Sequence, residues 1–187
     1  MEQGGNRAEK QERFWQRRRP FRRLAQDRSG SISIEFAILG LPFFLIVFSI
    51  LETAFIFIGD ITLEQAVAKA GRTVRTGQVA TSNISEAEFR TSICDEITLL
   101  LDCEKIRIDL RSYSDFTSIP TRAPITGGAV DSGTFTFERG NAGQIMALRT
   151  FYEYPLYTDI VHRFLSDLEG GKHLLMSVAV FQTEPFR

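Results

Sequence analysis

The sequence is poor in the side chains from which enzyme sites are usually built. Among 187 residues there are two histidines, two cysteines and one tryptophan. No G-x-S-x-G, H-E-x-x-H or phosphate-binding glycine loop is present. His162 and His173 stand alone, and nothing pairs the acidic residues or tyrosines into a nucleophile–base constellation. The sequence therefore predicts a protein that is not an enzyme and that has no cofactor or metal site.

The net charge of the chain is also low, because a basic N-terminal segment offsets an acidic remainder of the chain. The formal net charge is -1, but residues 1–30 carry nine Lys/Arg and four Asp/Glu, whereas residues 31–187 carry thirteen and nineteen. A hydrophobic content of 43% is too high for a disordered chain. The uneven charge argues against a simple cytosolic globule and against a DNA-binding domain spread along the chain.

The basic end contains a cluster of arginines interleaved with aromatic residues. The cluster comprises Arg17, Arg18, Arg19, Arg22 and Arg23. Such a cluster can be an RNA-binding arm. It can also be an orientation signal that stays in the cytoplasm and touches anionic lipid. We favour the second interpretation because an apolar segment follows.

Residues 36–59 form a long apolar run whose single charge is Glu52. As a helix these 24 residues would be about 36 Å long, enough to cross a hydrocarbon core of about 30 Å. The run is apolar on all sides, unlike a helix in a protein core. It is longer than the apolar part of a cleavable signal peptide, and no A-x-A-like site follows it. The arginine bias predicts a cytoplasmic N-terminus, with the rest of the chain across the membrane.

Two residues interrupt the apolar run. Pro42 removes a backbone donor and is expected to kink or loosen the helix. Glu52 lies about 24 Å along the helix from Phe36 and is expected to face the outer interface or to pair within an assembly. Beyond Asp60, apolar and charged residues alternate at helical spacing up to Gly77, which is placed as a C-cap. One helix of about 45 residues is predicted.

Residues 78–187 are expected to form a small α+β domain. Ser85 and Glu88 predict a capping box for a second helix that ends near Asp102, with Ile84 and Phe89 as its hydrophobic staple. A loop is expected over 117–133 and a short helix over 158–168. The sequence predicts an antiparallel sheet of about three to four strands, with the last apolar enough to be central: 106–110, a weak strand or edge over 134–137, 145–154 and 174–183.

Cys94 and Cys103 lie nine positions apart, around the end of the second helix. No histidine or further cysteine stands nearby to complete a metal site. In an oxidising compartment beyond the membrane, a disulfide is favoured over two buried free thiols. The bridge would join the helix end to the first strand and stabilise the fold by about 2–3 kcal/mol.

A distinctive pattern marks the border between the basic end and the apolar run. It reads Gly30-Ser31-Ile32-Ser33-Ile34-Glu35-Phe36. A carboxylate at the mouth of a membrane helix is unfavourable unless it is paired or reaches the interface. Glu35 therefore either marks the edge of the span and reaches water, or it has a partner. If the chain were cut after Gly30, the new amino group of Ser31 could pair with Glu35 of a neighbouring subunit.

This junction resembles the class III leader junction of type IV pilin-like proteins. Together with the apolar run, Pro42 and Glu52, it is similar to the TadE-like pseudopilins of Tad (Flp) pilus assembly systems. The cysteine pair, residues 113–116 and residues 183–186 extend the resemblance over most of 30–186. The resemblance implies that Gly30 is the cleavage position of a prepilin peptidase, Ser31 the mature N-terminus and Glu35 the acid needed for processing or assembly.

Some features depart from the commoner pattern of these proteins. The leader of 30 residues is long, and Ser31 stands where Ala or Phe is commoner. The domain is much larger than a major Flp pilin, which indicates a minor, pseudopilin-type subunit rather than the bulk of a filament. TadF and the larger TadG proteins share this type of span.

The resemblance implies a single-pass protein of the inner membrane. Residues 1–30 would be a cytoplasmic leader, 31–77 a transmembrane and amphipathic helix, and 78–187 a periplasmic domain. Expected partners are the prepilin peptidase, other pilin-like subunits and inner-membrane Tad assembly proteins, with no nucleic acid. An uncleaved bitopic membrane protein whose outer domain binds a ligand or an envelope component is the alternative, and a membrane-anchored enzyme is the third hypothesis.

Overall fold

The structure, a computed structural model, describes residues 31–97 and 99–186 and begins with one long helix. Helix α3 (Ser31–Arg75) has 45 residues and continues through Pro42. The predicted long helix is therefore confirmed. Gly77 follows it with a φ of 77°, the left-handed conformation expected of a residue just past a helix C-terminus.

The chain divides into two units, Met1–Ile46 and Val47–Arg187. In the first unit the described residues belong to the start of α3, where large apolar side chains such as Phe36, Leu39 and Phe43 are exposed. Within the described ranges, α3 is long and apolar enough to cross a membrane, and its most apolar stretch has no buried residue. An apolar surface on all sides is what a lipid environment favours.

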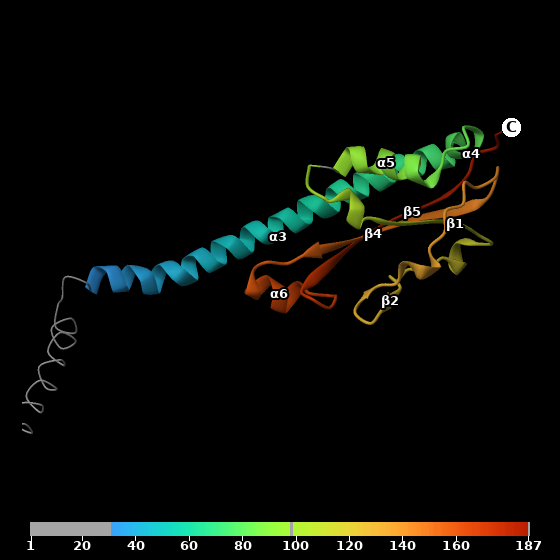
Figure 1. Cartoon of the computed structure of the whole chain (residues 1–187). Helices are drawn as coiled ribbons and strands as arrows, with labels where there is room; N and C mark the ends of the chain where they lie inside the picture. Colours follow the sequence, from blue (N-terminus) through green and yellow to red (C-terminus); the bar gives the residue numbers. More distant parts are fainter. Residues whose placement is uncertain (1–30, 98, 187) are drawn as a thin grey trace, which may run out of the picture. The chain divides into compact units, whose positions relative to one another are not determined.

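In the second unit, α4 (Gln78–Thr81) and α5 (Glu86–Ile97) follow the end of α3 (Figure 1). The predicted capping box is confirmed: the Ser85 N–H donates to Glu88 Oε2 at 2.8 Å, and the Glu88 N–H donates to Ser85 Oγ at 3.3 Å. These bonds lower the pKa of Glu88 below its ordinary value, the bond from the Ser85 backbone first.

Helix α5 ends earlier than predicted, at Ile97 instead of near Asp102. The N–H groups of Leu100 and Leu101 both donate to the Ile97 carbonyl at 3.0 Å, which closes a turn in place of a further helical turn. Leu101 turns into the core, whereas Leu99 is left exposed. The buried face of α5 is therefore not continued without interruption by the residues that follow Ile97.

Three antiparallel strands form the main sheet in the order β1-β4-β5: β1 (Arg107–Tyr113), β4 (Ile145–Pro155) and β5 (Lys172–Gln182). Helix α6 (Asp159–Leu165) connects β4 to β5. The prediction of a central last strand is wrong, since β4 is central and β5 lies at the edge. On β5, Leu175 and Ser177 are buried, whereas Val178 and Val180 are more than 40% exposed. Only one face of this apolar strand is therefore covered by the rest of the domain.

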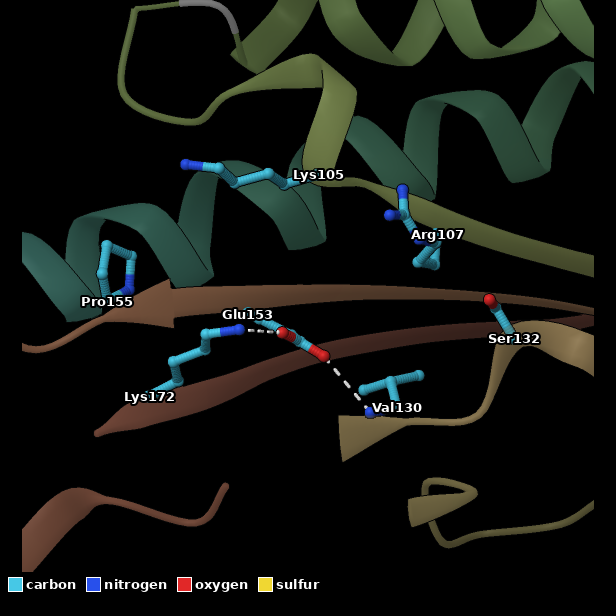
Figure 2. Close-up of a pocket in the computed structure, with 7 residues that line it drawn as sticks. All are labelled: Lys105, Arg107, Val130, Ser132, Glu153, Pro155 and Lys172. Atoms are coloured by element: carbon cyan, nitrogen blue, oxygen red, sulfur yellow. Dashed lines mark hydrogen bonds and ion pairs between the residues drawn. The ribbon is translucent and has the colours of Figure 1, made fainter. Parts of the chain in front are cut away.

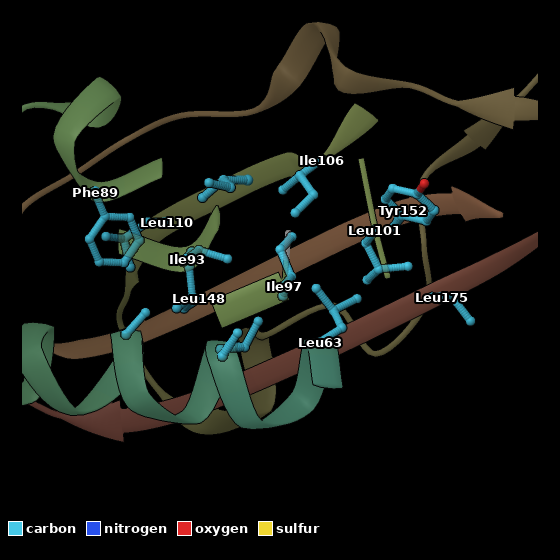
Figure 3. Close-up of a cluster of buried hydrophobic side chains, with 14 of the residues drawn as sticks. Leu63, Phe89, Ile93, Ile97, Leu101, Ile106, Leu110, Leu148, Tyr152 and Leu175 are labelled. Atoms are coloured by element: carbon cyan, nitrogen blue, oxygen red, sulfur yellow. The ribbon is translucent and has the colours of Figure 1, made fainter. Parts of the chain in front are cut away.

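The main core lies between α3, α5 and one face of the sheet (Figure 3). Helix α3 lies close to β5 at Gly71. A Cβ added at this glycine would be only 3.1 Å from the Cβ of Ala179. The second half of α3 is thus a core helix of the domain. The largest fully buried side chains of this core are Phe89, Leu63, Ile93, Ile97, Ile106, Leu110, Met146, Leu148, Leu175, Val67 and Val74.

The opposite face of the sheet is built around a buried carboxylate. Asp109 is fully buried and accepts hydrogen bonds from Arg149 Nε at 3.0 Å and from Arg111 Nε at 2.9 Å. The two guanidinium groups and the Thr136 N–H supply the partners that a buried charge requires. Phe135 stacks on Phe151 beside them, with ring centroids 5.1 Å apart.

The segment over this face is more regular than the predicted loop. It contains short 3-10 turns and a two-stranded sheet: η3 (Phe116–Ser118), β2 (Ile125–Thr126), β3 (Ala129–Val130) and η4 (Ser132–Thr134). The weak strand expected over 134–137 is reduced to a parallel bridge between Phe137 and Leu110 at the sheet edge.

The C-terminal segment returns to the end of α3. The Glu184 N–H donates to the Arg75 carbonyl at 2.8 Å, and the ring of Phe186 covers Gly77 so closely that a Cβ there would come 2.2 Å from it. A residue with a side chain at Gly77 would therefore meet both a strained φ and a steric clash.

We predict that Gly77→Ala lowers the stability of the full chain in detergent by more than Gly143→Ala does. Gly143 has nearly the same φ, 76°, but nothing lies within 4 Å of its added Cβ, so this variant measures backbone strain alone, about 1 kcal/mol. Thermal unfolding followed by circular dichroism gives both values. Equal losses would contradict the proposed packing of Phe186 on Gly77.

Candidate functional site

Only part of the predicted processing site falls within the described residues. Gly30, the expected cleavage position, lies outside them, and Ser31 is the first residue of α3. Glu35, Phe36 and Pro42 are exposed on this helix. Within the described ranges, Glu35 forms no ion pair, which leaves its carboxylate open to a partner from another chain. Its roles in processing and assembly stay predictions.

Unlike Glu35, Glu52 has hydrogen-bond partners within the chain. It is 8% exposed, on the side of α3 that faces the domain. Its two oxygens accept hydrogen bonds from consecutive backbone N–H groups, Tyr157 on Oε1 and Thr158 on Oε2, the latter at 2.8 Å. The structure does not bring Glu52 and Glu35 together, since they lie seventeen positions apart on one helix.

The partners of Glu52 come from the start of α6. Thr158 is the N-cap residue of this helix, and its own side chain makes no capping bond. The carboxylate thus supplies an acceptor and a negative charge where the N-terminus of a helix favours one. Burial, followed by the nearby Tyr157 and Glu52, raises the pKa of Tyr154 above its ordinary value.

Sequence reasoning expected Glu52 to face the outer interface or to pair within an assembly, and it missed the hydrogen bonds that Glu52 accepts within the chain. Backbone amides carry no residue signature, so the pairing with residues 105 and 106 positions away could not be read from the sequence. Thr53, next to Glu52, donates its hydroxyl to the Ser49 carbonyl at 2.8 Å and so needs no outside partner. A role of Glu52 in assembly stays a prediction.

A cleft of about 410 Å³ lies beside Glu52, between α3 and β5. Its wall is mostly apolar, with Asp60 and His173 as its titratable groups. The His173 Nδ1 lies 2.8 Å from the Leu165 carbonyl and 2.5 Å from an Asp167 oxygen, so this histidine holds the turn after α6. The ring of His162 packs on Gly171 at the same turn. A Cβ added at Gly171 would lie 2.2 Å from that ring. The positions of both histidines are those of structural residues.

A second cleft, of about 370 Å³, is polar (Figure 2). Glu153 accepts from Lys172 Nζ at 2.7 Å and from the Val130 N–H at 3.2 Å. Lys105 pairs with Asp102, and Arg107 donates to the Glu104 carbonyl. Because these charged groups bind one another or the backbone, the cleft resembles a solvated surface more than a ligand site.

The predicted disulfide is present between Cys94 and Cys103, whose Cα atoms are 5.4 Å apart. Cys94 lies in the buried face of α5, and Cys103 begins the turn η2 (Cys103–Lys105) just before β1. The bridge therefore joins α5 to the first strand. Among the described residues, no group of three or more His, Cys, Asp or Glu side chains could hold a metal ion.

A long apolar helix that runs directly into an α+β domain fits the architecture of a single-pass membrane protein. Residues 30–72 match the family described as TadE-like protein. The match starts at Gly30 and covers Glu35, Pro42 and Glu52, so it confirms the resemblance to TadE-like proteins over this segment. It supports a component associated with the Tad pilus. No curated protein and no solved structure matches the chain.

We predict that Glu52→Ala frees the start of α6, because two part-buried N–H groups lose the carboxylate that accepts their hydrogen bonds, at a net cost of about 0.5–1.5 kcal/mol each. Hydrogen exchange of the Tyr157 and Thr158 amides should become faster than in the wild type, while the amides of β4 stay protected. Glu64→Ala, which removes an exposed carboxylate from the same helix, is the control. Unchanged exchange in Glu52→Ala would show that the carboxylate does not hold α6.

A pH dependence is expected from Glu153. The bond from Lys172 lowers the pKa of Glu153 below its ordinary value of 4.5, and burial opposes this only in part. The resulting stabilisation, at most about 1 kcal/mol for a partly exposed pair, is present above pH 4.5 and is lost as the pH falls through the lowered pKa. Unfolding curves between neutral and acidic pH should show a smaller loss in Glu153→Gln, and parallel losses would contradict this assignment.

Proposed function

We propose that this chain is a minor, pilin-like component of Tad-type pilus assembly, processed by a prepilin peptidase and acting through association of membrane helices. The observation that carries the proposal is the TadE-like match over residues 30–72, which begins at Gly30 and ends inside α3. The helix has the length and apolar surface that a retained pilin-type span needs. We propose further that the chain is not an enzyme.

The proposed mechanism begins with cleavage after Gly30. Hydrolysis of the peptide bond would release the basic leader and leave an ammonium group on Ser31 at the start of α3. Glu35, one helical turn further on, is exposed and without an ion pair in the described ranges. In a low-dielectric environment its carboxylate would gain most from an ammonium group of a neighbouring subunit, which would set the stagger between adjacent helices.

The proposed location is the inner membrane, with the α+β domain in the periplasm. The arginine cluster before the span supports a cytoplasmic N-terminus. The disulfide supports an oxidising compartment for the domain, because such bonds persist there and are rare in the cytosol. Contacts with the prepilin peptidase, other pilin-like subunits and inner-membrane assembly proteins would then be made through α3, through Glu35 and through the outer surface of the domain.

We predict that co-expression with an active prepilin peptidase yields a chain that begins at Ser31. N-terminal sequencing of the membrane-extracted protein measures this directly. Retention of residues 1–30 in such a host would instead favour the uncleaved bitopic protein whose domain binds an envelope component. A catalytically inactive peptidase is the control.

Glu35→Gln tests the pairing step apart from cleavage. The amide keeps the shape of the side chain but removes the charge that would attract an ammonium group. Cross-linking between subunits in the membrane is expected to fall, while Glu64→Gln, a matched exposed position further along α3, should not change it. Normal cleavage and normal cross-linking in Glu35→Gln would contradict a pairing role for this acid.

A further inference from the structure

Helix α6 carries an apolar stripe that the domain does not cover. Tyr157 and Phe164 are each 83% exposed, and Ile160 lies between them at a spacing of three and four residues. Ile160 and Phe164, four residues apart, lie on one face of α6, and Tyr157 stands just before the N-cap residue Thr158. The neighbouring Val161 is buried, so α6 already has a core-facing side. The exposed stripe is therefore a second apolar face, separate from the one that packs.

The place of this stripe is fixed by Glu52. The carboxylate binds the backbone N–H groups of Tyr157 and Thr158, which holds the start of α6 against α3 at this level. Residues 32–51, between the start of α3 and Glu52, have a helical length of about 30 Å, the thickness of a hydrocarbon core. Glu52, and with it the start of α6, thus lies where a span of this length ends.

Other exposed apolar side chains lie on and beside the part of α3 that follows Glu52. Beyond Glu52 the outer side of α3 stays apolar up to Ile61, and Leu99 is 92% exposed in the turn before Leu101, which packs near Gly59. Together with the α6 stripe they form what we call the apolar collar. Its members are Phe55, Phe57, Ile58, Ile61, Leu99, Leu100, Tyr157, Ile160 and Phe164.

The opposite end of the sheet has a different surface. Tyr113 pairs with Ile145, and Ile145 pairs with Gln182, so these residues mark the end of the sheet away from α6. Phe116, just after this end of β1, is a lone exposed aromatic residue among hydroxyl and carboxylate groups. The exposed apolar side chains are thus concentrated at the end of the domain where α3 enters, although Val178 and Val180 on β5 are also exposed.

We propose that the α6 stripe inserts into the outer interface of the same phospholipid bilayer that α3 spans, so that α6 lies along the membrane surface. The occupant is the boundary between lipid headgroups and acyl chains, where aromatic rings with one polar end, such as Tyr157, are favoured. We choose lipid as the occupant because the α6 stripe is continuous with the exposed apolar side of α3. Arg163, beside Phe164, is exposed and pairs with Asp159 at 3.0 Å, and in this arrangement it would lie among the lipid phosphates.

The membrane-bound stripe would restrain the domain. Two attachments, α3 itself and the α6 stripe, would fix the tilt of the sheet relative to the bilayer plane, whereas α3 alone leaves the domain free to rotate about the helix axis. The inference rests on the membrane anchoring within the proposed function, and not on cleavage or on pilus assembly.

Single-tryptophan chains test this inference. Trp15, the one tryptophan of the sequence, is replaced by Phe, and Phe164→Trp is introduced in the full chain. The protein is reconstituted at high dilution in vesicles of phosphatidylethanolamine and phosphatidylglycerol, with or without bromine on the acyl chains. Phe116→Trp is the matched control at the other end of the sheet, and Ile50→Trp reports on the span itself.

We expect the Phe164→Trp chain to emit at short wavelength and to lose much of its emission in brominated vesicles, as the Ile50→Trp chain does. The Phe116→Trp chain should emit at long wavelength and be unaffected by bromine. If the Phe164→Trp chain instead behaves like the Phe116→Trp chain, the stripe lies in water and the inference is wrong.

Two further outcomes would also overturn it. A short-wavelength emission that bromine does not quench and that disappears on dilution would place the stripe against a second copy of the chain. An Ile50→Trp chain without quenching would show that the membrane anchoring itself fails, which is distinguishable from failure of the α6 contact alone. Tyr157→Trp repeats the test should Phe164→Trp disturb the fold, which circular dichroism would reveal.

Discussion

The buried carboxylate of Glu52 is the constraint around which the second unit is arranged. An uncompensated charge at this position would cost several kcal/mol, so the chain must bring hydrogen-bond donors to it. Two backbone N–H groups before α6 do this, and in doing so they hold the β4–α6 connection against α3. Strands β4 and β5 then run from this point in opposite directions over eleven paired positions. The same carboxylate lies near the point where the domain begins to cover one side of α3.

Beyond Glu52, the helix that is long and apolar enough to span a membrane is also a core element of the domain. Leu63, Val67 and Val74 are fully buried against α5 and the sheet, and Gly71 allows β5 to approach closely. The main core of the domain therefore cannot form without the second half of α3. A displacement of this part of the helix would be carried directly into the sheet, because a close-packed core transmits strain. Such a coupling suits a subunit whose helices pack laterally while its domain presents a surface outside the membrane.

Features that depend on neighbouring residues could be predicted from the sequence, whereas features that depend on contacts between distant parts of the chain could not. The capping box of Ser85 and Glu88, the left-handed Gly77 and the long helix all follow from neighbouring residues, and the structure has each of them. The end of α5 and the edge position of β5 were missed, because both depend on which apolar face finds a partner across the core. The resemblance located the Glu35 region, but no local signal indicates that backbone N–H groups more than 100 positions away bind Glu52.

The polar groups of the described part of the chain mostly bind one another. Asp109 is held by Arg149 and Arg111, Glu153 by Lys172, and His173 by Asp167, and each group fixes a strand or a turn. The large exposed apolar side chains of the second unit gather mainly at the collar. Exposed apolar surfaces of that kind are covered by lipid or by other helices. Such a surface is expected of a component that works by association in a membrane.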